Sequence, residues 1–287
     1  MIWENLRCEE FPDAVRKAKG LCVVPVGCLE RHGRHLPLGT DTICARETAI
    51  RAAELEPVVV FPTMFFGEKS GAGEFPGTVI FSVETRWQIF KETCCEIYRN
   101  GFDKILFLNG HGGNDSMLDF FARNMLQVEP RVRIFRCSTN ANVKKLNGLT
   151  QAIQDERLTD EDRAMLQAFV DENRAVGHAC ILETAKAYYT HPHTVRLSGI
   201  TEESGDNTHR FDEMTKMGIS SPVAWAANFP NSYGASNQFT VNERIAEVVS
   251  EIYIADTAKQ FKFLKEETIS EAYLAEWQAK QKRHEFK

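Results

Sequence analysis

Short apolar runs alternate along this chain with longer segments of helical period, and this alternation constrains the fold more than any other feature. The predicted strands are residues 21–26, 58–62, 104–108 and 132–135, and the predicted helices between them are residues 40–55, 83–100 and 116–126. Strands that alternate with helices of this length form βαβ units, whose strands run parallel. The order therefore predicts an α/β fold with a mostly parallel central sheet.

Two later segments depart from this alternation. Residues 140–175 are polar and acidic at their centre. They contain an amphipathic helix that opens at Thr159, so we interpret them as an insertion. Residues 199–234 are rich in Gly, Ser, Asn and Pro and lack periodicity, as is typical of covering loops.

The C-terminal part, residues 240–287, is predicted to be a helical extension. Residues 240–243 have the pattern of a capping box that starts at Thr240. The apolar stripe that follows is predicted to pack on the sheet, and it consists of Ile245, Val248, Val249 and Ile252. We expect residues 1–287 to form a single domain that includes the insertion and this extension.

Composition and charge exclude several classes of protein. The chain has 34 Lys and Arg against 40 Asp and Glu, a net charge of −6, which does not suit a nucleic-acid-binding surface. The most apolar run is broken by Pro62 and is far shorter than the roughly 20 residues that a membrane helix needs. The N-terminus lacks the features of a secretory signal. The 8 cysteines are scattered without a C-x-x-C pair, which predicts reduced thiols and a cytoplasmic location.

Acidic and imidazole side chains gather just after predicted strands, where open α/β sheets bind their ligands. They lie in three loops, residues 27–41, 109–114 and 178–184. The candidates in these loops are Glu30, His32, Asp41, His111, His178 and Glu183.

This mixed set of nitrogen and oxygen donors suits Zn²⁺, Mn²⁺ or Fe²⁺, and not the all-oxygen shell of Ca²⁺. Taken singly, each residue has an ordinary structural explanation. Glu30 and His32 could lie on a loop surface, His111 could bond to backbone in a glycine turn, and Asp41 could cap a helix. Three strand ends would then carry acids and imidazoles by accident, so the set together predicts a metal site.

The two longer motifs resemble those of the creatininase (creatinine amidohydrolase) family. Residues 27–41 match its Gly-x-x-Glu-x-His-Gly-x-His-Leu-Pro-x-Gly-Thr-Asp pattern, and residues 109–114 match its Asn-Gly-His-Gly-Gly-Asn turn. Weaker likeness at residues 75–78, 178–184 and 192–196 extends the resemblance over most of the chain. The resemblance implies a three-layer α/β/α fold and a hydrolytic centre with two divalent metal ions, zinc in first place and manganese or iron as alternatives.

Carried over position by position, the resemblance implies that Glu30, Asp41 and His111 hold one ion. His32 and Asp41 would hold the second ion, so that Asp41 bridges the two.

The second site departs from creatininase itself. Creatininase has another Glu two residues beyond the His of the Asn-Gly-His turn, where this chain has Gly113. Many family members share the glycine, and in them the later Glu of the His-x-x-x-x-Glu-Thr segment is the natural replacement. The resemblance therefore implies Glu183 as a ligand of the second ion.

Two such ions lower the pKa of a bridging water from about 15.7 toward neutrality, so that hydroxide can attack a polarised carbonyl. His178 is the predicted catalytic residue, which would give a proton to the leaving group or hold the oxyanion. The alternative is a histidine at a helix start that bonds only to backbone. His35 is interpreted as a packing or orienting residue. The remaining histidines, interpreted as structural or exposed, are His191, His193 and His209.

The substrate pocket departs further from the family pattern. Relatives often carry Ser-x-Glu-His where this chain has residues 69–72, and Ile181 stands where many relatives have another Glu. We therefore expect a small cyclic or linear amide other than creatinine. Arg31 and Arg34 are candidate substrate-binding residues for an anionic or polyol-like group, or else loop arginines paired with local acids.

Three functions remain open from the sequence. The first is a metal-dependent hydrolase that opens a C–N bond. The second is a C–C bond hydrolase acting on a cyclic ketone of inositol or sugar catabolism, and the third is a non-catalytic small-molecule binding protein of the same fold. The expected partners are a small-molecule substrate and further copies of the chain, up to a hexamer as the resemblance implies, with neither nucleic acid nor a membrane.

Overall fold

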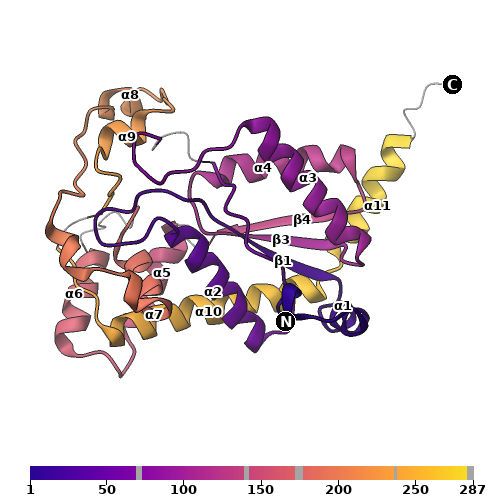
Figure 1. Ribbon diagram of the computed structural model, residues 1–287, viewed down its shortest axis with the longest axis horizontal. Coiled ribbons are helices and arrows are strands. Elements are labelled where there is room, and N and C mark those ends of the chain that lie inside the picture. The colour runs from indigo at the N-terminus through magenta and orange to yellow at the C-terminus, as the bar shows by residue number, and fades with distance from the viewer. Residues whose placement is uncertain (69–72, 139–141, 172–176, 236–237, 283–287) are drawn as a thin grey trace.

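A parallel sheet lies at the centre of the molecule (Figure 1). The computed structural model describes residues 1–287 except 69–72, 139–141, 172–176, 236–237 and 283–287. In this described part the sheet has four strands in the order β2-β1-β3-β4. They are β1 (Leu21–Val26), β2 (Val59–Val60), β3 (Lys104–Asn109) and β4 (Arg133–Ser138). The predicted parallel sheet is confirmed. Residues 69–72, which depart from the family pattern, lie outside the described residues.

The two inner strands, β1 and β3, are buried along their whole length. They pair in register from Leu21 opposite Lys104 to Val26 opposite Asn109, so both strands end at the same edge of the sheet. Successive side chains of a strand point to opposite faces. Helices must therefore cover both faces, which explains the continuous apolar runs in the sequence.

Helices form one layer on each face of the sheet (Figure 1). Side chains of α1 (Phe11–Lys17), α3 (Val83–Arg99) and α4 (Asn114–Val128) pack with Val24 and Phe107 of the strands. On the other face, α2 (Thr40–Leu55) and α10 (Glu243–Glu266) pack with Val23 and Leu106. This arrangement agrees with the predicted three-layer α/β/α fold.

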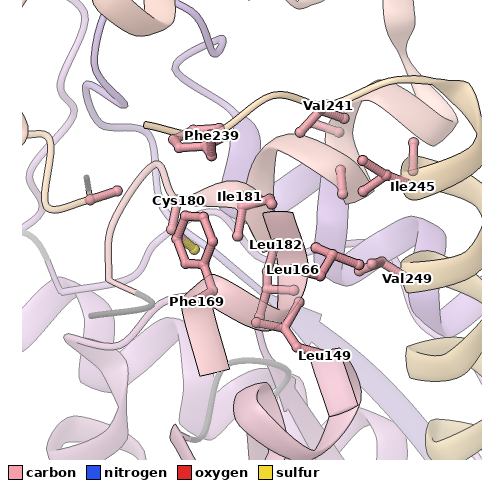
Figure 2. Close-up of a cluster of buried hydrophobic side chains, with 14 of the residues drawn as sticks. Leu149, Leu166, Phe169, Cys180, Ile181, Leu182, Phe239, Val241, Ile245 and Val249 are labelled. Carbon is pink, nitrogen blue, oxygen red and sulfur yellow. The ribbon is translucent and has the colours of Figure 1, made fainter. Parts of the chain in front are cut away.

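Helix α10 departs from the prediction in two ways. Its first half does not pack on the sheet, because Ile245, Val248 and Val249 join a second core with α5 (Asn142–Ile153), α6 (Asp160–Asp171) and α7 (Ile181–Thr190). Figure 2 shows part of this core. The later half carries the residues that reach the sheet, which are Ile254, Ala258, Phe261 and Leu264.

The second departure concerns the start of α10. The predicted capping residue Thr240 is wrong, because Asn242 is the N-cap and its side chain accepts a hydrogen bond from the Ile245 N–H at 2.9 Å. The amide of Asn242 also donates to Asp162 of α6, 2.7 Å away. This hydrogen bond to α6 holds Asn242 in place as the N-cap instead of Thr240.

The helix predicted to open at Thr159 begins as expected. The Asp162 N–H donates to the Thr159 hydroxyl at 3.2 Å, and the Thr159 N–H donates to the Asp162 carboxylate at 3.1 Å. Arg244 also donates to Asp162, at 3.0 Å. These bonds tie α6 to the start of α10, while the division of the chain into a core, an insertion and an extension stays a prediction.

The remaining elements are short or terminal. The segment predicted as a covering loop contains short helices, and α11 (Ile269–Lys282) follows α10. The short elements are η1 (Trp3–Asn5), η2 (Cys8–Glu10), η3 (Pro192–Thr194), η4 (Leu197–Thr201), α8 (Asp212–Lys216) and α9 (Ala224–Asn228). Among the described helices, none combines the length and the apolar character needed to cross a membrane.

Candidate metal centre

The six predicted side chains come together beside the carboxyl ends of β1 and β3. They are contributed by the loop after β1, the first turn of α2, the turn after β3, and the start of α7 with the residues before it. Five of them are buried, which are Glu30, His32, Asp41, His111 and Glu183, and His178 has a side chain only 10% exposed.

Two glycines allow the backbone segments beneath the cluster to approach each other. A Cβ at Gly27 would lie 2.5 Å from the backbone nitrogen of Thr42, and a Cβ at Gly110 would lie 2.4 Å from the carbonyl oxygen of Asp41. Any larger residue would force these segments apart. The glycines therefore bring the start of α2 against the turns that carry Glu30 and His111.

Glu30, Asp41 and His111 form one compact group of donors. His111 Nδ1 lies 2.9 Å from Glu30 Oε1 and also 2.9 Å from Asp41 Oδ2. The thiol of Cys28 joins this group, with its Sγ 3.1 Å from Asp41 Oδ2. Cys28 is not among the residues predicted from the sequence, although it lies two positions after β1 and two positions before Glu30.

His32, Asp41 and Glu183 form the second group. His32 Nε2 lies 3.1 Å from Asp41 Oδ1 and 3.9 Å from Glu183 Oε2. Since Asp41 Oδ2 faces His111, the carboxylate directs one oxygen toward each group. His32 Nδ1 lies 3.1 Å from the carbonyl oxygen of Glu30. This contact requires a hydrogen on Nδ1 and orients Nε2 toward Asp41, as in metal-binding histidines.

The electrostatics of the cluster fit a cation. Burial alone would raise the pKa of Glu30, but the imidazoles of His178 and His111 outweigh it and lower that pKa to about 2. Burial would likewise lower the pKa of His32, but Asp41, Glu30 and Glu183 raise it to about 9. Glu30 and Asp41 likewise outweigh burial and raise the pKa of His111, so protonated His32 and His111 balance the buried carboxylates. A divalent ion can replace those protons, and the donor set of imidazoles and carboxylates suits zinc or manganese.

His178 stands above this cluster. Its Nε2 lies 2.7 Å from the carbonyl oxygen of Arg31, which can only accept, so Nε2 carries the hydrogen. The ring lies 4.0 Å from the His32 ring and meets Trp225 edge to face at 5.2 Å. The backbone bond agrees with the structural alternative for Nε2, and it leaves Nδ1 as the nitrogen that can exchange a proton. Burial lowers the pKa of His178, so the ring is neutral near pH 7.

The backbone turns sharply after His178. Ala179 has a φ of 55°, in the left-handed region that residues with a Cβ rarely adopt. In this conformation the Ala179 N–H donates to Glu183 Oε2 at 2.6 Å. The turn thus positions the side chains of both His178 and Glu183.

Arg31 and Arg34 lie outside both donor groups. Arg31 Nη2 lies 2.5 Å from Glu203 Oε2 and Arg34 Nε lies 3.2 Å from the same oxygen. The Arg31 guanidinium also covers the ring of Phe75 at 4.6 Å. Both arginines are therefore paired with a local acid, and their role in substrate binding stays a prediction.

His35 links two of the three loops. Its Nε2 lies 3.1 Å from the carbonyl oxygen of Ala179 and 3.1 Å from the hydroxyl of Thr184, and its ring packs against Tyr233. The ring is buried, so His35 has the packing and orienting position expected of it. The other three histidines lie outside the candidate groups, His191 half-buried and His193 and His209 exposed.

A family model described as creatininase, creatinine amidohydrolase, matches residues 4–258 of the chain. The chain belongs to the creatininase family. The creatinine amidohydrolase of Pseudomonas putida is 32% identical over 110 residues, which are 36% of this chain and 42% of that protein. The match thus spans less than half of that relative. The mycofactocin precursor peptide peptidase of Mycolicibacterium smegmatis is 30% identical over 183 residues, 57% of this chain and 72% of that protein.

Solved structures of the creatininase family share the fold. A crystal structure of creatinine amidohydrolase (creatininase) superposes with a TM-score of 0.70 at 20% identity, over 93% of this chain and 98% of that one. A putative creatinine amidohydrolase from Bacteroides fragilis gives 0.68 at 21% identity, over 87% and 91%. Related creatininase structures are described as a Zn-Zn type and as a Mn form. The predicted fold and family are thereby confirmed.

Proposed function

We propose that this chain is a metal-dependent hydrolase that adds water to the carbonyl carbon of a small cyclic or linear amide. The observation that carries the proposal is the shared carboxylate of Asp41, which directs Oδ2 to His111 and Oδ1 to His32. Divalent ions in the two groups would supply the positive charge that lowers the pKa of a water toward neutrality and polarises the carbonyl.

The proposed ligands follow the two donor groups. Glu30, His111 and Asp41 Oδ2 would hold one ion, and His32, Glu183 and Asp41 Oδ1 the other. We place zinc first and keep manganese and iron as alternatives. Imidazole and carboxylate donors suit all three metals.

His178 is the proposed proton carrier. Its Nε2–H is held by the Arg31 carbonyl, so a proton taken from the attacking water would be accepted at Nδ1. The imidazolium that forms would be stabilised by Glu30, whose Oε2 lies 3.7 Å from Nε2. The same proton can then pass from Nδ1 to the leaving nitrogen.

The names of two relatives favour a C–N bond as the one that is broken. One is an amidohydrolase and the other a peptidase, and both terms denote hydrolysis of a C–N bond. We therefore rank amides and short peptides above cyclic ketones as substrates. Hydrolysis of a ketone panel, with no activity on cyclic amides, linear amides or peptides, would reverse this order.

Metal analysis tests the proposal directly. Protein purified without chelator should contain about two divalent ions per chain. Chelation should remove both the ions and the amide hydrolysis, and Zn²⁺ or Mn²⁺ should restore them. A chain that holds no Zn, Mn or Fe, and gains none on reconstitution, would contradict the proposal and favour a protein without this centre.

The proposal includes assembly into a homo-oligomer, up to a hexamer. Several large apolar side chains of the segment around α8 and α9 are exposed, namely Met214, Met217, Ile219, Val223 and Trp225. A contact between copies would bury this surface. Light scattering at micromolar concentration should give a mass of two or more chains, and a monomer would contradict the proposal. A cytoplasmic location also stays a prediction.

A further inference from the structure

We propose that the thiol of Cys28 is a ligand of the ion held by Glu30, Asp41 and His111, which gives this position one sulfur donor and a preference for zinc over manganese. The inference rests on the proposed function, because it requires an ion at this position. None of the motifs that identify the centre includes the thiol.

The geometry places the sulfur among the other donors. Cys28 Sγ lies 3.1 Å from Asp41 Oδ2 and 3.5 Å from Glu30 Oε1. Donor atoms of Cys28, Glu30, Asp41 and His111 all lie within 4.8 Å of one another, and the four residues are buried. Donors around a tetrahedral zinc ion, at about 2.0 to 2.3 Å from it, are about 3.3 to 3.5 Å apart. The separations between His111, Glu30, Asp41 and Cys28 donor atoms, from 2.9 to 3.5 Å, are close to these values.

The surroundings of Cys28 differ from those of the chain's other buried cysteines. Cys22 and Cys94 belong to the apolar core beneath α3, and Cys180 belongs to the core beside α7. Cys44 is also close to the centre, but its Sγ lies 4.0 Å from a backbone oxygen of Glu183 and in neither donor group. Among these cysteines, Cys28 alone faces two carboxylates and an imidazole.

Two states of the thiol are chemically distinct. Without an ion, the S–H donates to Asp41 Oδ2, the nearest oxygen. When an ion binds, the sulfur gives its proton to solvent and its lone pair forms the bond to the metal. Thiolate is a soft donor that selects zinc, whereas manganese prefers oxygen donors. A thiol that only donates to Asp41 would leave the metal with nitrogen and oxygen ligands alone.

X-ray absorption on the full chain loaded with Zn²⁺ distinguishes these states. We expect one sulfur neighbour at about 2.3 Å from zinc. Loading with Co²⁺ should give a near-ultraviolet band of sulfur-to-cobalt charge transfer. Cys28→Ser should lose both signals, while the matched variant Cys44→Ser should keep them. In competition between the two metals, Cys28→Ser should lose at least about tenfold of its preference for zinc over manganese.

The wild-type spectrum decides the question even if Cys28→Ser does not fold. Bound zinc with only nitrogen and oxygen neighbours would overturn the sulfur ligand and leave the proposed hydrolase intact. Retention of the charge-transfer band in Cys28→Ser would also overturn it. A wild-type chain that binds neither Zn²⁺ nor Co²⁺ would overturn both the sulfur ligand and the proposed function.

Discussion

Glu183 Oε2 lies 3.9 Å from His32 Nε2 and also accepts a hydrogen bond from the Ala179 N–H, 2.6 Å away. The first contact suits a ligand of the second ion. The second contact suits a residue that braces the turn before its own helix. Both contacts are made by the same oxygen, whose two lone pairs can serve an N–H and an ion at once, but only the ligand role changes how many ions the chain holds.

Glu183→Gln should retain the ion at Glu30 and His111 and weaken the other, because an amide oxygen is a much poorer ligand than a carboxylate. Elemental analysis after dialysis should fall from about two ions per chain to about one. Glu202→Gln, which removes an acid paired with Arg196 instead, should keep both. Two tightly bound ions in Glu183→Gln would show that Glu183 only braces the turn.

Asp41→Asn should disturb both ions at once. Each of its carboxylate oxygens faces a different donor group, and the amide that replaces them has a single uncharged acceptor oxygen. Calorimetric titration with Zn²⁺ should show both binding steps weakened. One step that keeps its wild-type affinity would rule out a bridging role.

His178→Ala should lower kcat by about 10²- to 10⁴-fold, the usual contribution of a proton-transfer group, with unchanged metal content. Ser232→Ala is the matched control, because its hydroxyl donates to the same Arg31 carbonyl at 3.0 Å without a place in the proton path. We expect the control to lose less than about tenfold. Similar small losses in both variants would make His178 a packing residue beneath Trp225.

His35 should make the stability of the metal-free chain depend on pH. Burial lowers its pKa to about 4, against about 6.5 in an unfolded chain. Between these values the unfolded state binds a proton that the folded state does not, so the free energy of unfolding falls as the pH falls from about 6.5 to 4. Near pH 4 this effect lowers the free energy of unfolding by about 3 kcal/mol relative to neutral pH.

The variant His35→Gln tests this assignment, because its amide can still donate to the Ala179 carbonyl while it does not titrate. Denaturant titrations of chelated protein at about pH 7 and about pH 4.5 should show a smaller loss of stability in the variant. Equal losses in both proteins would mean that His35 is not the group responsible.

Arg34→Gln should change the KM for neutral and anionic amides by less than about threefold. The guanidinium already pairs with Glu203, and its side chain is 55% exposed, so solvent screens its charge. Steady-state kinetics with matched neutral and anionic amides measure the effect. A tenfold rise in KM confined to the anionic substrate would support Arg34 as a substrate-binding residue.

Local patterns predict much of this fold. The predicted ranges 21–26 and 40–55 agree with β1 and α2 at both ends, because a buried apolar run and an amphipathic helix are visible in the sequence itself. The Thr240 cap was wrong because the choice of Asn242 depends on Asp162, which lies 80 residues away in the sequence. Contacts between distant segments leave no trace in local periodicity.

The candidate site shows the same limit. Glu30, His32 and Asp41 could be found because they share one loop with a recognisable pattern. Cys28 lies in that loop too, but scattered cysteines without paired spacing indicate only reduced thiols. Its distance to Asp41 depends on the backbone crossing at Gly27, which only the three-dimensional arrangement reveals.

The close crossings at Gly27 and Gly110 have a consequence for protein engineering. Even an alanine at either position would meet backbone atoms within 2.5 Å, so these two glycines fix how closely the backbone segments beneath the carboxylates approach each other. The segment with α8 and α9 takes no part in these close crossings and exposes many of its side chains. Exchange of that segment for the equivalent part of another family member can therefore change which molecules reach the centre, while the candidate metal ligands and their backbone stay the same.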